Sequence, residues 1–299
     1  MQKDSKSVQL RALQLLQLSI LKKVRDVCLE NDIRYYIVAG TLLGAVRHGG
    51  FIPWDDDIDI AMYRDDYDRF REIAPTELGE EFFVQTWEND RNYPRYITKV
   101  RVSGTCYLEA SFRGIDMHHG VFVDIFPLDN ISKSNGPLVH LRGLAIRVLR
   151  MLKTIKVVKP EIESVSGAKA RLRQLAKLII RPFTSMLSDG FLGHSLDHLH
   201  TMTNGKGGEL TTCFSSGYEW RKEVVPNEVY GNGVPLMFEG EVFNAPAQWD
   251  LLLRRIYGDY MTPPPEEERV SGHAILKLHL GKYESELMRR VLDEGQRIA

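Results

Sequence analysis

Apolar and polar positions follow two different periods along the chain, which predicts both helices and short strands. Over residues 8–30, apolar side chains recur every three or four positions, as in an amphipathic helix that packs on a domain. Short apolar runs bounded by glycine or polar residues predict strands instead, at 34–40, 57–62, 82–86, 96–102, 120–126 and 234–238. Further helices are expected to open at Thr41 as the N-cap and to cover 63–74, 138–158, 167–187, 246–257 and the C-terminal segment. We therefore expect an α+β fold, in which a mixed β-sheet core is flanked by helices.

Charge divides this chain into two parts. Residues 133–185 contain twelve Lys or Arg and only two acids, although the whole chain has 39 basic and 40 acidic residues. We therefore expect a domain formed by residues 1–130 and 205–299, interrupted by a basic helical insertion at 131–204. Basic amphipathic helices can lie on an anionic membrane, or they can cover the core and pair with the acidic remainder; both remain open. The balanced total charge gives no reason to expect a nucleic acid partner.

Cysteine use and hydropathy indicate the setting of the protein. Cys28, Cys106 and Cys213 are few and far apart, so they fit neither a disulfide framework nor a paired zinc-binding motif. The N-terminus carries charges throughout, unlike a signal peptide, and the chain has no uncharged apolar stretch of 18 residues. We expect a cytoplasmic protein, in peripheral contact with the inner face of the cell membrane if the basic helices bind lipid.

The stretch WDDDIDIAM places unusual negative charge at the start of a strand. In an extended strand Asp57 and Asp59 share one face, while Ile58 and Ile60 anchor the other. Asp124 stands alone among the apolar residues of VFVDIFP on a later strand, where an uncompensated carboxylate would be costly. These three carboxylates predict a site for Mg²⁺ or Mn²⁺. A solvated acidic turn, with Asp124 paired to an arginine, is the alternative.

Neighbouring residues refine this prediction. Asp55 and Asp56 either cap the strand or support the ligands. An EF-hand is excluded because Ile60 occupies the loop position that needs glycine. Upstream, a short strand ends at Gly40 and a helix opens at Thr41, an arrangement that can bind an anion through backbone N–H groups.

Longer motifs surround these residues: GTLLGAVRHGGFIPWDDDIDIAM, YITKVRVSGT, GVFVDIFPLD and YGDYMTPPPEEERVSGH. Over about residues 30–130 and 235–273 the chain thereby resembles the LicD family and the related fukutin-type transferases. The resemblance implies a nucleotidyltransferase-like fold and the transfer of phosphocholine, or a related phospho-alcohol, from a CDP-alcohol such as CDP-choline to a glycan hydroxyl, with release of CMP. The acceptor would be a cell-surface glycan such as teichoic acid or lipopolysaccharide, including lipid-linked forms.

The same resemblance implies roles for individual residues. Asp57 and Asp59 would be metal ligands, and Asp124 would be the third ligand or the base that takes the acceptor proton. Backbone N–H groups near Gly40 and Thr41 would hold phosphate oxygens. Six further side chains are candidates for contact with the nucleotide, the diphosphate or the acceptor, each also explicable as ordinary core or surface: Arg47, Trp54, Lys99, Arg101, Arg269 and His273.

Two other functions remain open at this stage. The same fold could transfer a nucleotidyl group to a sugar or small molecule, which the products would reveal. A non-enzymatic alternative is an inactive, membrane-associated scaffold of a glycan-assembly complex. His194 and His198 lie one helical turn apart, with Asp197 and His200 nearby, but a zinc site is disfavoured because no cysteine or further histidine lies within reach.

Overall fold

The computed structural model describes residues 2–132, 136–158, 167–205 and 208–298. The described residues form nine α-helices: α1 (Gln2–Glu30), α2 (Ala39–His48), α3 (Arg64–Glu77), α4 (Pro137–Val157), α5 (Ala168–Met186), α6 (Asp189–Thr201), α7 (Asn227–Tyr230), α8 (Trp249–Tyr257) and α9 (Glu284–Ile298). They also form eleven strands: β1 (Tyr36–Ile37), β2 (Asp59–Tyr63), β3 (Phe82–Gln85), β4 (Thr98–Val102), β5 (Cys106–Glu109), β6 (Phe122–Ile131), β7 (Leu210–Thr212), β8 (Val225–Pro226), β9 (Val234–Phe238), β10 (Glu241–Ala245) and β11 (Ile275–His279).

A mixed sheet organises the molecule around its longest strand, β6. The strand order is β1-β2-β6-β4-β3, and β7 continues the sheet by pairing with the C-terminal part of β6 and with β8. Strand β2 runs parallel to β6, whereas β4 and β7 run antiparallel to it. This sheet and its flanking helices confirm the expectation of an α+β fold.

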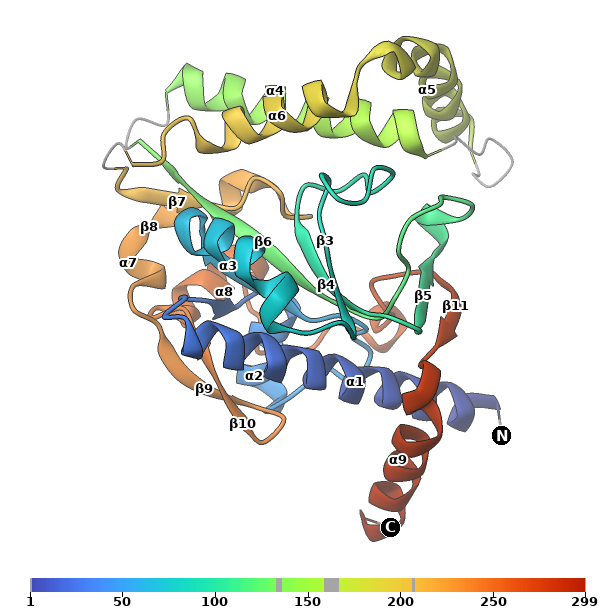
Figure 1. Cartoon of the computed structure of the whole chain (residues 1–299). Helices are drawn as coiled ribbons and strands as arrows, with labels where there is room; N and C mark the ends of the chain where they lie inside the picture. The colour runs from blue at the N-terminus through green and yellow to red at the C-terminus, as the bar shows by residue number, and fades with distance from the viewer. Residues whose placement is uncertain (1, 133–135, 159–166, 206–207, 299) are drawn as a thin grey trace.

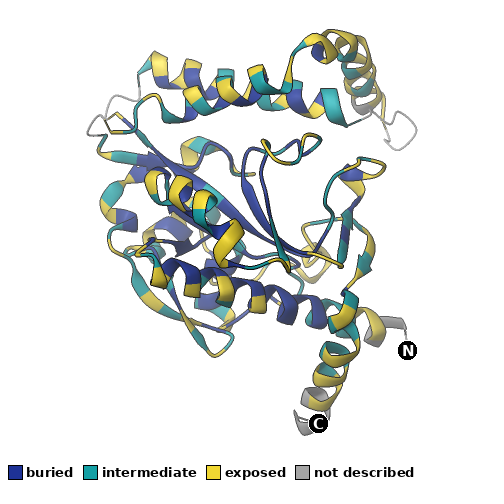
Figure 2. Cartoon of the chain, viewed as in Figure 1, coloured by how far each residue is buried: buried dark blue, intermediate teal, exposed yellow. Residues whose placement is uncertain are grey.

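Helices cover the sheet in layers that Figure 1 shows. Helix α1 packs on β4 and β6 and lies beside α9, while α4 and α6 lie together in a separate layer with α5 at its end. The inner strands are buried, and α5 is exposed over most of its surface (Figure 2). Within the described residues, no helix is long and apolar enough to cross a membrane.

Several element boundaries differ from the sequence predictions. Helix α2 begins at Ala39, so Thr41 is a buried residue inside the first turn rather than the N-cap. Strand β2 begins at Asp59, which leaves Asp57 just ahead of it. The basic insertion has the two predicted helices and a third, α6, whose N-cap Ser188 accepts a hydrogen bond from the Phe191 N–H. Short strands such as β5, β7, β10 and β11 were not predicted, because three to five residues carry too little periodicity to be recognised.

Candidate active site

The three predicted aspartates line one cavity of about 380 Å³. Asp59 opens β2 and lies opposite Asp124 in the parallel register of β2 and β6. Asp57 precedes Asp59 by two residues, and it faces the same cavity. The Asp59 N–H donates to Thr41 Oγ1 over 2.8 Å, so the buried threonine of α2 fixes the start of the strand. Adjacent parallel strands therefore bring together carboxylates that are 65 residues apart in the chain.

The electrostatics of these carboxylates favour a bound cation. Burial, together with the charges of Asp124 and Asp56, raises the pKa of Asp57 to about 6, against the opposing influence of His273 and Lys99. Burial and the neighbouring carboxylates also raise the pKa of Asp59. A divalent cation bound among these oxygens would remove the repulsion, and carboxylate oxygens are the ligands that Mg²⁺ and Mn²⁺ prefer. The donor set fits the expected metal.

Lys99 forms an ion pair with one of these carboxylates, Asp124. It lies opposite Asp124 in the antiparallel register of β4 and β6, and its Nζ is 2.6 Å from Asp124 Oδ1. Its side chain is fully buried, and Nζ is 3.2 Å from the centroid of the Phe122 ring. Burial lowers the pKa of Lys99 to about 8 despite the attraction of Asp124. Lys99 therefore orients Asp124 and does not form an exposed phosphate clamp.

Asp56 joins the C-terminal segment to the acidic cluster. Its carboxylate accepts hydrogen bonds from Tyr107 Oη at 2.8 Å and from Ser271 Oγ, and it lies 3.0 Å from His273 Nδ1. Although burial opposes its charge, these partners hold the pKa of Asp56 below its usual value. Among the described residues, only Asp56, Asp57 and His273 form a trio of potential ligands whose atoms lie within 4.8 Å of one another. Asp57, Asp59 and Asp124 share the cavity but are less closely grouped. His273, predicted from its motif, thus lies at the cavity.

The Asp55 carboxyl packs against the start of α2, where the sequence predicts an anion site. A Cβ at Gly40 would meet Asp55 Oδ2 at 2.6 Å, so glycine is required there for the carboxyl to fit. Burial and the charges of Asp57 and Asp56 raise the pKa of Asp55 to about 8. Val38 and Ala39 line the cavity, and Ala39 has a left-handed backbone with φ of 49°. Phosphate binding at Gly40 and Thr41 stays a prediction.

Four other predicted contacts lie elsewhere in the described structure. Arg101 is buried and donates to Gln85 Oε1 at 2.5 Å and to the Gly120 carbonyl at 2.6 Å, so it lacks the exposed face that a diphosphate clamp requires. Arg47 leaves the last turn of α2 and donates to the Tyr260 carbonyl. The guanidinium of Arg269 lies 5.5 Å from the centroid of the Trp54 ring, away from the residues that line the cavity.

Comparison with known proteins identifies this arrangement. Residues 32–136 match the family described as "LicD/FKTN/FKRP, nucleotidyltransferase domain". The chain is 29% identical over 272 residues to the lipopolysaccharide cholinephosphotransferase LicD of Haemophilus influenzae, across 90% of this chain and 97% of that protein. Residues 32–136 therefore carry a LicD-family domain. Human ribitol 5-phosphate transferase FKRP is 43% identical over 47 residues, which is 16% of this chain and 10% of that protein.

The sequence analysis did not predict four of the side chains that line this cavity. They are contributed by loops and short helices rather than by the motifs: Arg95, Tyr218, Glu223 and Tyr230. The Tyr218 hydroxyl contacts that of Tyr257 from α8, and Arg95 lies 3.0 Å from Glu109. No local pattern marks these residues: the chain after the insertion brings Tyr218, Glu223 and Tyr230 to the cavity, and Arg95 lies in the loop before β4.

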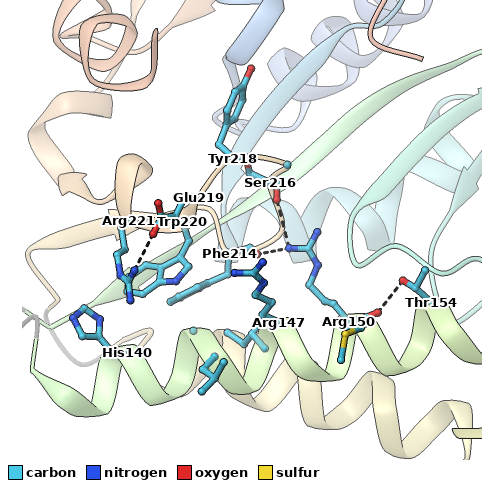
Figure 3. Close-up of a pocket in the computed structure, with 15 residues that line it drawn as sticks. His140, Arg147, Arg150, Thr154, Phe214, Ser216, Tyr218, Glu219, Trp220 and Arg221 are labelled. Carbon is cyan, nitrogen blue, oxygen red and sulfur yellow. Dashed lines mark hydrogen bonds and ion pairs between the residues drawn. The ribbon is translucent and has the colours of Figure 1, made fainter. Parts of the chain in front are cut away.

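A second hollow of about 580 Å³ adjoins the first and shares Ser216, Gly217 and Tyr218 with it (Figure 3). Helix α4 forms one wall of this hollow, and residues 214–221 form the other. Arg150 of α4 donates to the carbonyls of Phe214 at 2.7 Å and Ser215 at 2.9 Å. The insertion therefore holds the loop that lines the cavity of the three aspartates.

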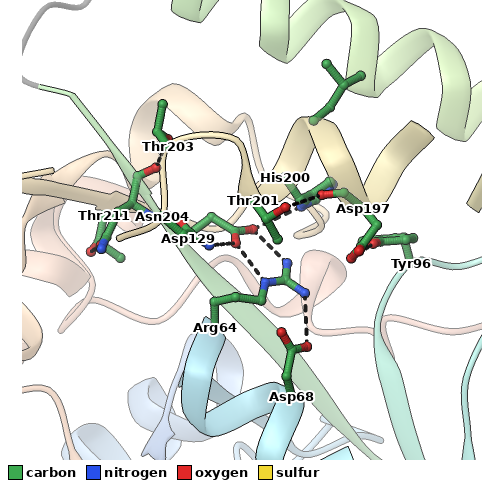
Figure 4. Close-up of polar contacts among 12 residues, drawn as sticks. Arg64, Asp68, Tyr96, Asp129, Asp197, His200, Thr201, Thr203, Asn204 and Thr211 are labelled. Carbon is green, nitrogen blue, oxygen red and sulfur yellow. Dashed lines mark hydrogen bonds and ion pairs between the residues drawn. The ribbon is translucent and has the colours of Figure 1, made fainter. Parts of the chain in front are cut away.

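A buried ionic network fastens the insertion to the sheet (Figure 4). Asp129 of β6 accepts two hydrogen bonds of 2.9 Å from Arg64 of α3 and contacts His200 Nδ1 of α6 at 3.0 Å. Asn204 donates to the same carboxylate at 2.9 Å. Burial opposes the charge of Asp129, but the Arg64 guanidinium and the His200 contact hold its pKa far below the usual value. This network was not predicted from the sequence.

Proposed function

We propose that this protein transfers phosphocholine or a related phospho-alcohol from a CDP-alcohol to a hydroxyl of a cell-surface glycan, releasing CMP. The LicD-family domain supports a transferase of phosphorus-containing groups, as does a similarity to LicD that extends over nearly the whole of both chains. The observation that carries the proposal is the convergence of Asp57, Asp59 and Asp124 on one cavity.

The carboxylates suit a metal-dependent reaction on a diphosphate. Asp57, Asp59 and Asp124 would hold Mg²⁺ or Mn²⁺, with Asp56 and His273 beside them. Such a metal would neutralise charge that develops on the phosphate oxygens. Lys99 fixes the orientation of Asp124, so the three carboxylates need little rearrangement to act together.

The proposed reaction exchanges one P–O bond for another. The acceptor hydroxyl oxygen attacks the phosphorus next to the alcohol, a new P–O bond forms, and the P–O bond to CMP breaks. The hydroxyl proton must be accepted by a base. Asp124 lines the same cavity and would be either this base or the third metal ligand, and its ion pair with Lys99 favours the role of a ligand.

Incubation with several CDP-alcohols and a lipopolysaccharide or teichoic acid preparation tests this proposal. We expect Mg²⁺-dependent CMP release and transfer of the phospho-alcohol to the glycan. Cytidine nucleotide retained on the acceptor, with free phospho-alcohol as the second product, would support nucleotidyl transfer instead. Absence of any transfer, with intact CDP-alcohols, would contradict both reactions and would leave the scaffold alternative.

We also propose that α5 rests on an anionic membrane surface. Apolar side chains of α5 recur at helical spacing and are exposed, including Ile179 at 71% and Phe183 at 69% (Figure 2). The helix has no acidic residue, and its outward cations are Lys169, Arg171, Arg173 and Lys177. This combination of an apolar face and flanking cations is that of an interfacial helix, and its charge complements anionic headgroups.

Helix α4 behaves differently from α5. Four of its five cations turn toward the protein. Arg142 and Arg150 donate to backbone carbonyls, Lys153 lies 5.2 Å from the centroid of the Trp87 ring, and Lys156 pairs with Asp189. Both interpretations of the basic segment therefore have support, the structural one for α4 and the membrane one for α5.

Flotation with phosphatidylcholine vesicles, with and without phosphatidylglycerol, tests the membrane contact. We expect binding only with the anionic lipid, and loss of about 100-fold in affinity when Lys169, Arg173 and Lys177 are changed to Glu, since each cation contributes about 1 kcal/mol. The matched control changes three exposed cations elsewhere, Lys23, Arg69 and Lys277, to Glu. Equal loss in both variants, or self-association through α5 without lipid binding, would contradict the proposal.

A further inference from the structure

Glu223 is a buried acid at the cavity that the proposed chemistry does not use. It ends a short 3₁₀ helix, Trp220–Glu223, and its residue exposure is 7%. It lines the same cavity as the three aspartates. Among the described residues, its Oε1 is enclosed and has no hydrogen-bond partner. A buried carboxyl oxygen without a partner is costly, so it needs an explanation.

The charged groups near Glu223 do not explain its unpartnered oxygen. Arg150, the nearest cation that acts on Glu223, directs its guanidinium to the backbone carbonyls of residues 214–216. Burial raises the pKa of Glu223 to about 8, against the hydrogen bond with Ser216 and the charge of Arg150. The free cavity therefore favours the neutral carboxyl, and a bound cation would favour the carboxylate.

The surroundings of Glu223 are apolar and aromatic. The cavity wall that accompanies it includes Phe126, Leu128, Tyr218, Tyr230 and Leu252. Aromatic rings attract a cation through their electron-rich faces, and methylated ammonium groups are recognised by such rings with a nearby carboxylate.

Strand β6 relates this wall to the aspartates. Asp124, Phe126 and Leu128 alternate along β6 and face the cavity together. Leu128 lies next to Asp129, which pairs with Thr212, and Cys213 and Glu223 follow around that end of the cavity. The apolar wall thus extends from the acidic cluster over four residues, about 13 Å at ~3.3 Å per residue. A phospho-alcohol with its phosphate at the aspartates would extend its alcohol along this wall.

We propose that Glu223, with the rings of Phe126, Tyr218 and Tyr230, binds the positively charged head of a cationic alcohol, of the quaternary ammonium class. This inference rests on the proposed function, because it assumes that the phosphate of the donor lies at the aspartates. It selects a cationic alcohol over neutral polyols. The specificity comes from one carboxylate, since the apolar wall by itself accepts any hydrocarbon chain.

Calorimetric binding of CDP-choline, CDP-glycerol and CDP to the whole protein tests this role. Glu223→Gln keeps the shape of the side chain and removes its charge. We expect the Kd for CDP-choline to rise about tenfold or more, because a charged partner is lost, and the Kd for CDP-glycerol and CDP to change less than about twofold. Glu219→Gln is the control on the same segment, since Glu219 is exposed and pairs with Arg221.

The outcomes separate the two proposals. Equal affinity of Glu223→Gln and the unaltered protein for CDP-choline would overturn the role of Glu223 alone, as would tighter binding of CDP-glycerol than CDP-choline. If none of the three nucleotides binds, the proposed donor is wrong and this inference fails with it. The thermal unfolding midpoint of Glu223→Gln shows whether the variant is folded; if it is not, Tyr230→Leu, which removes a ring of the same wall, takes its place in the same titration.

Discussion

Asp59→Asn is expected to reduce turnover by about a thousandfold or more while the protein stays folded. Metal-held charge stabilisation contributes several kcal/mol to a transition state, and each 1.36 kcal/mol is tenfold in rate. Asp59 is suited to this role because burial and neighbouring carboxylates raise its pKa, so its charged form needs a cation. Asparagine resembles the neutral acid and relieves the repulsion, so the free energy of unfolding should stay level or rise.

The measurement pairs CMP release at saturating Mg²⁺ with thermal unfolding. Asp57→Asn should behave in the same way, and Asp68→Asn, on the exposed side of α3, should leave the rate unchanged. Normal turnover in Asp57→Asn and Asp59→Asn would show that the acidic cluster is not the metal site. Loss of turnover counts only if thermal unfolding shows that the variant is folded.

The expected stability of Asp124→Asn differs from that of Asp57→Asn and Asp59→Asn. From the sequence alone, all three Asn variants are expected to remain folded. The structure pairs Asp124 with Lys99, whose side chain is fully buried, so Asp124→Asn also removes the counter-charge of a buried cation. Loss of stability in this variant would therefore report the ion pair, and Asp124→Asn combined with Lys99→Met would recover part of it.

The sequence could predict the acidic site because strand geometry carries the information locally. Alternation places Asp57 and Asp59 on one face, and a lone Asp124 in an apolar strand demands a partner. In the structure these three residues line one cavity. The helices of the basic segment were predictable for a similar reason, since 19 or 21 residues give several turns of periodic pattern.

Other features depend on long-range packing that no local pattern contains. Spacing placed Lys99 and Arg101 on one strand face, but it could not tell that this face is buried, and both side chains point into the core. Glu223 and Tyr218 reach the cavity only because α4 holds the loop after the insertion. A count of cations likewise could not distinguish α4, which turns them inward, from α5, which does not.

The Arg64–Asp129 pair gives the second large effect, on stability. Asp129→Asn should lower the free energy of unfolding by about 3–5 kcal/mol, because it leaves the Arg64 guanidinium, only 5% exposed, without its carboxylate. Chemical denaturation measures this loss. Asp68→Asn is the matched control: Asp68 lies 3.7 Å from the same guanidinium but is half exposed, so its removal should cost less than about 1 kcal/mol.

Low pH should destabilise the protein partly through the same Arg64–Asp129 pair. The pKa of Asp129 is lower in the folded protein than its value near 3.9 in an unfolded chain. Its stabilisation is therefore complete above the unfolded value and is lost as the pH falls toward the folded value. Asp129→Asn should flatten this part of the pH–stability profile. An unchanged profile would mean that the acid sensitivity arises from other carboxylates.

Asp129 also contacts His200 and Asn204, so Asp129→Asn should loosen α6 and the loop after it before the sheet unfolds. Hydrogen exchange would detect this local opening.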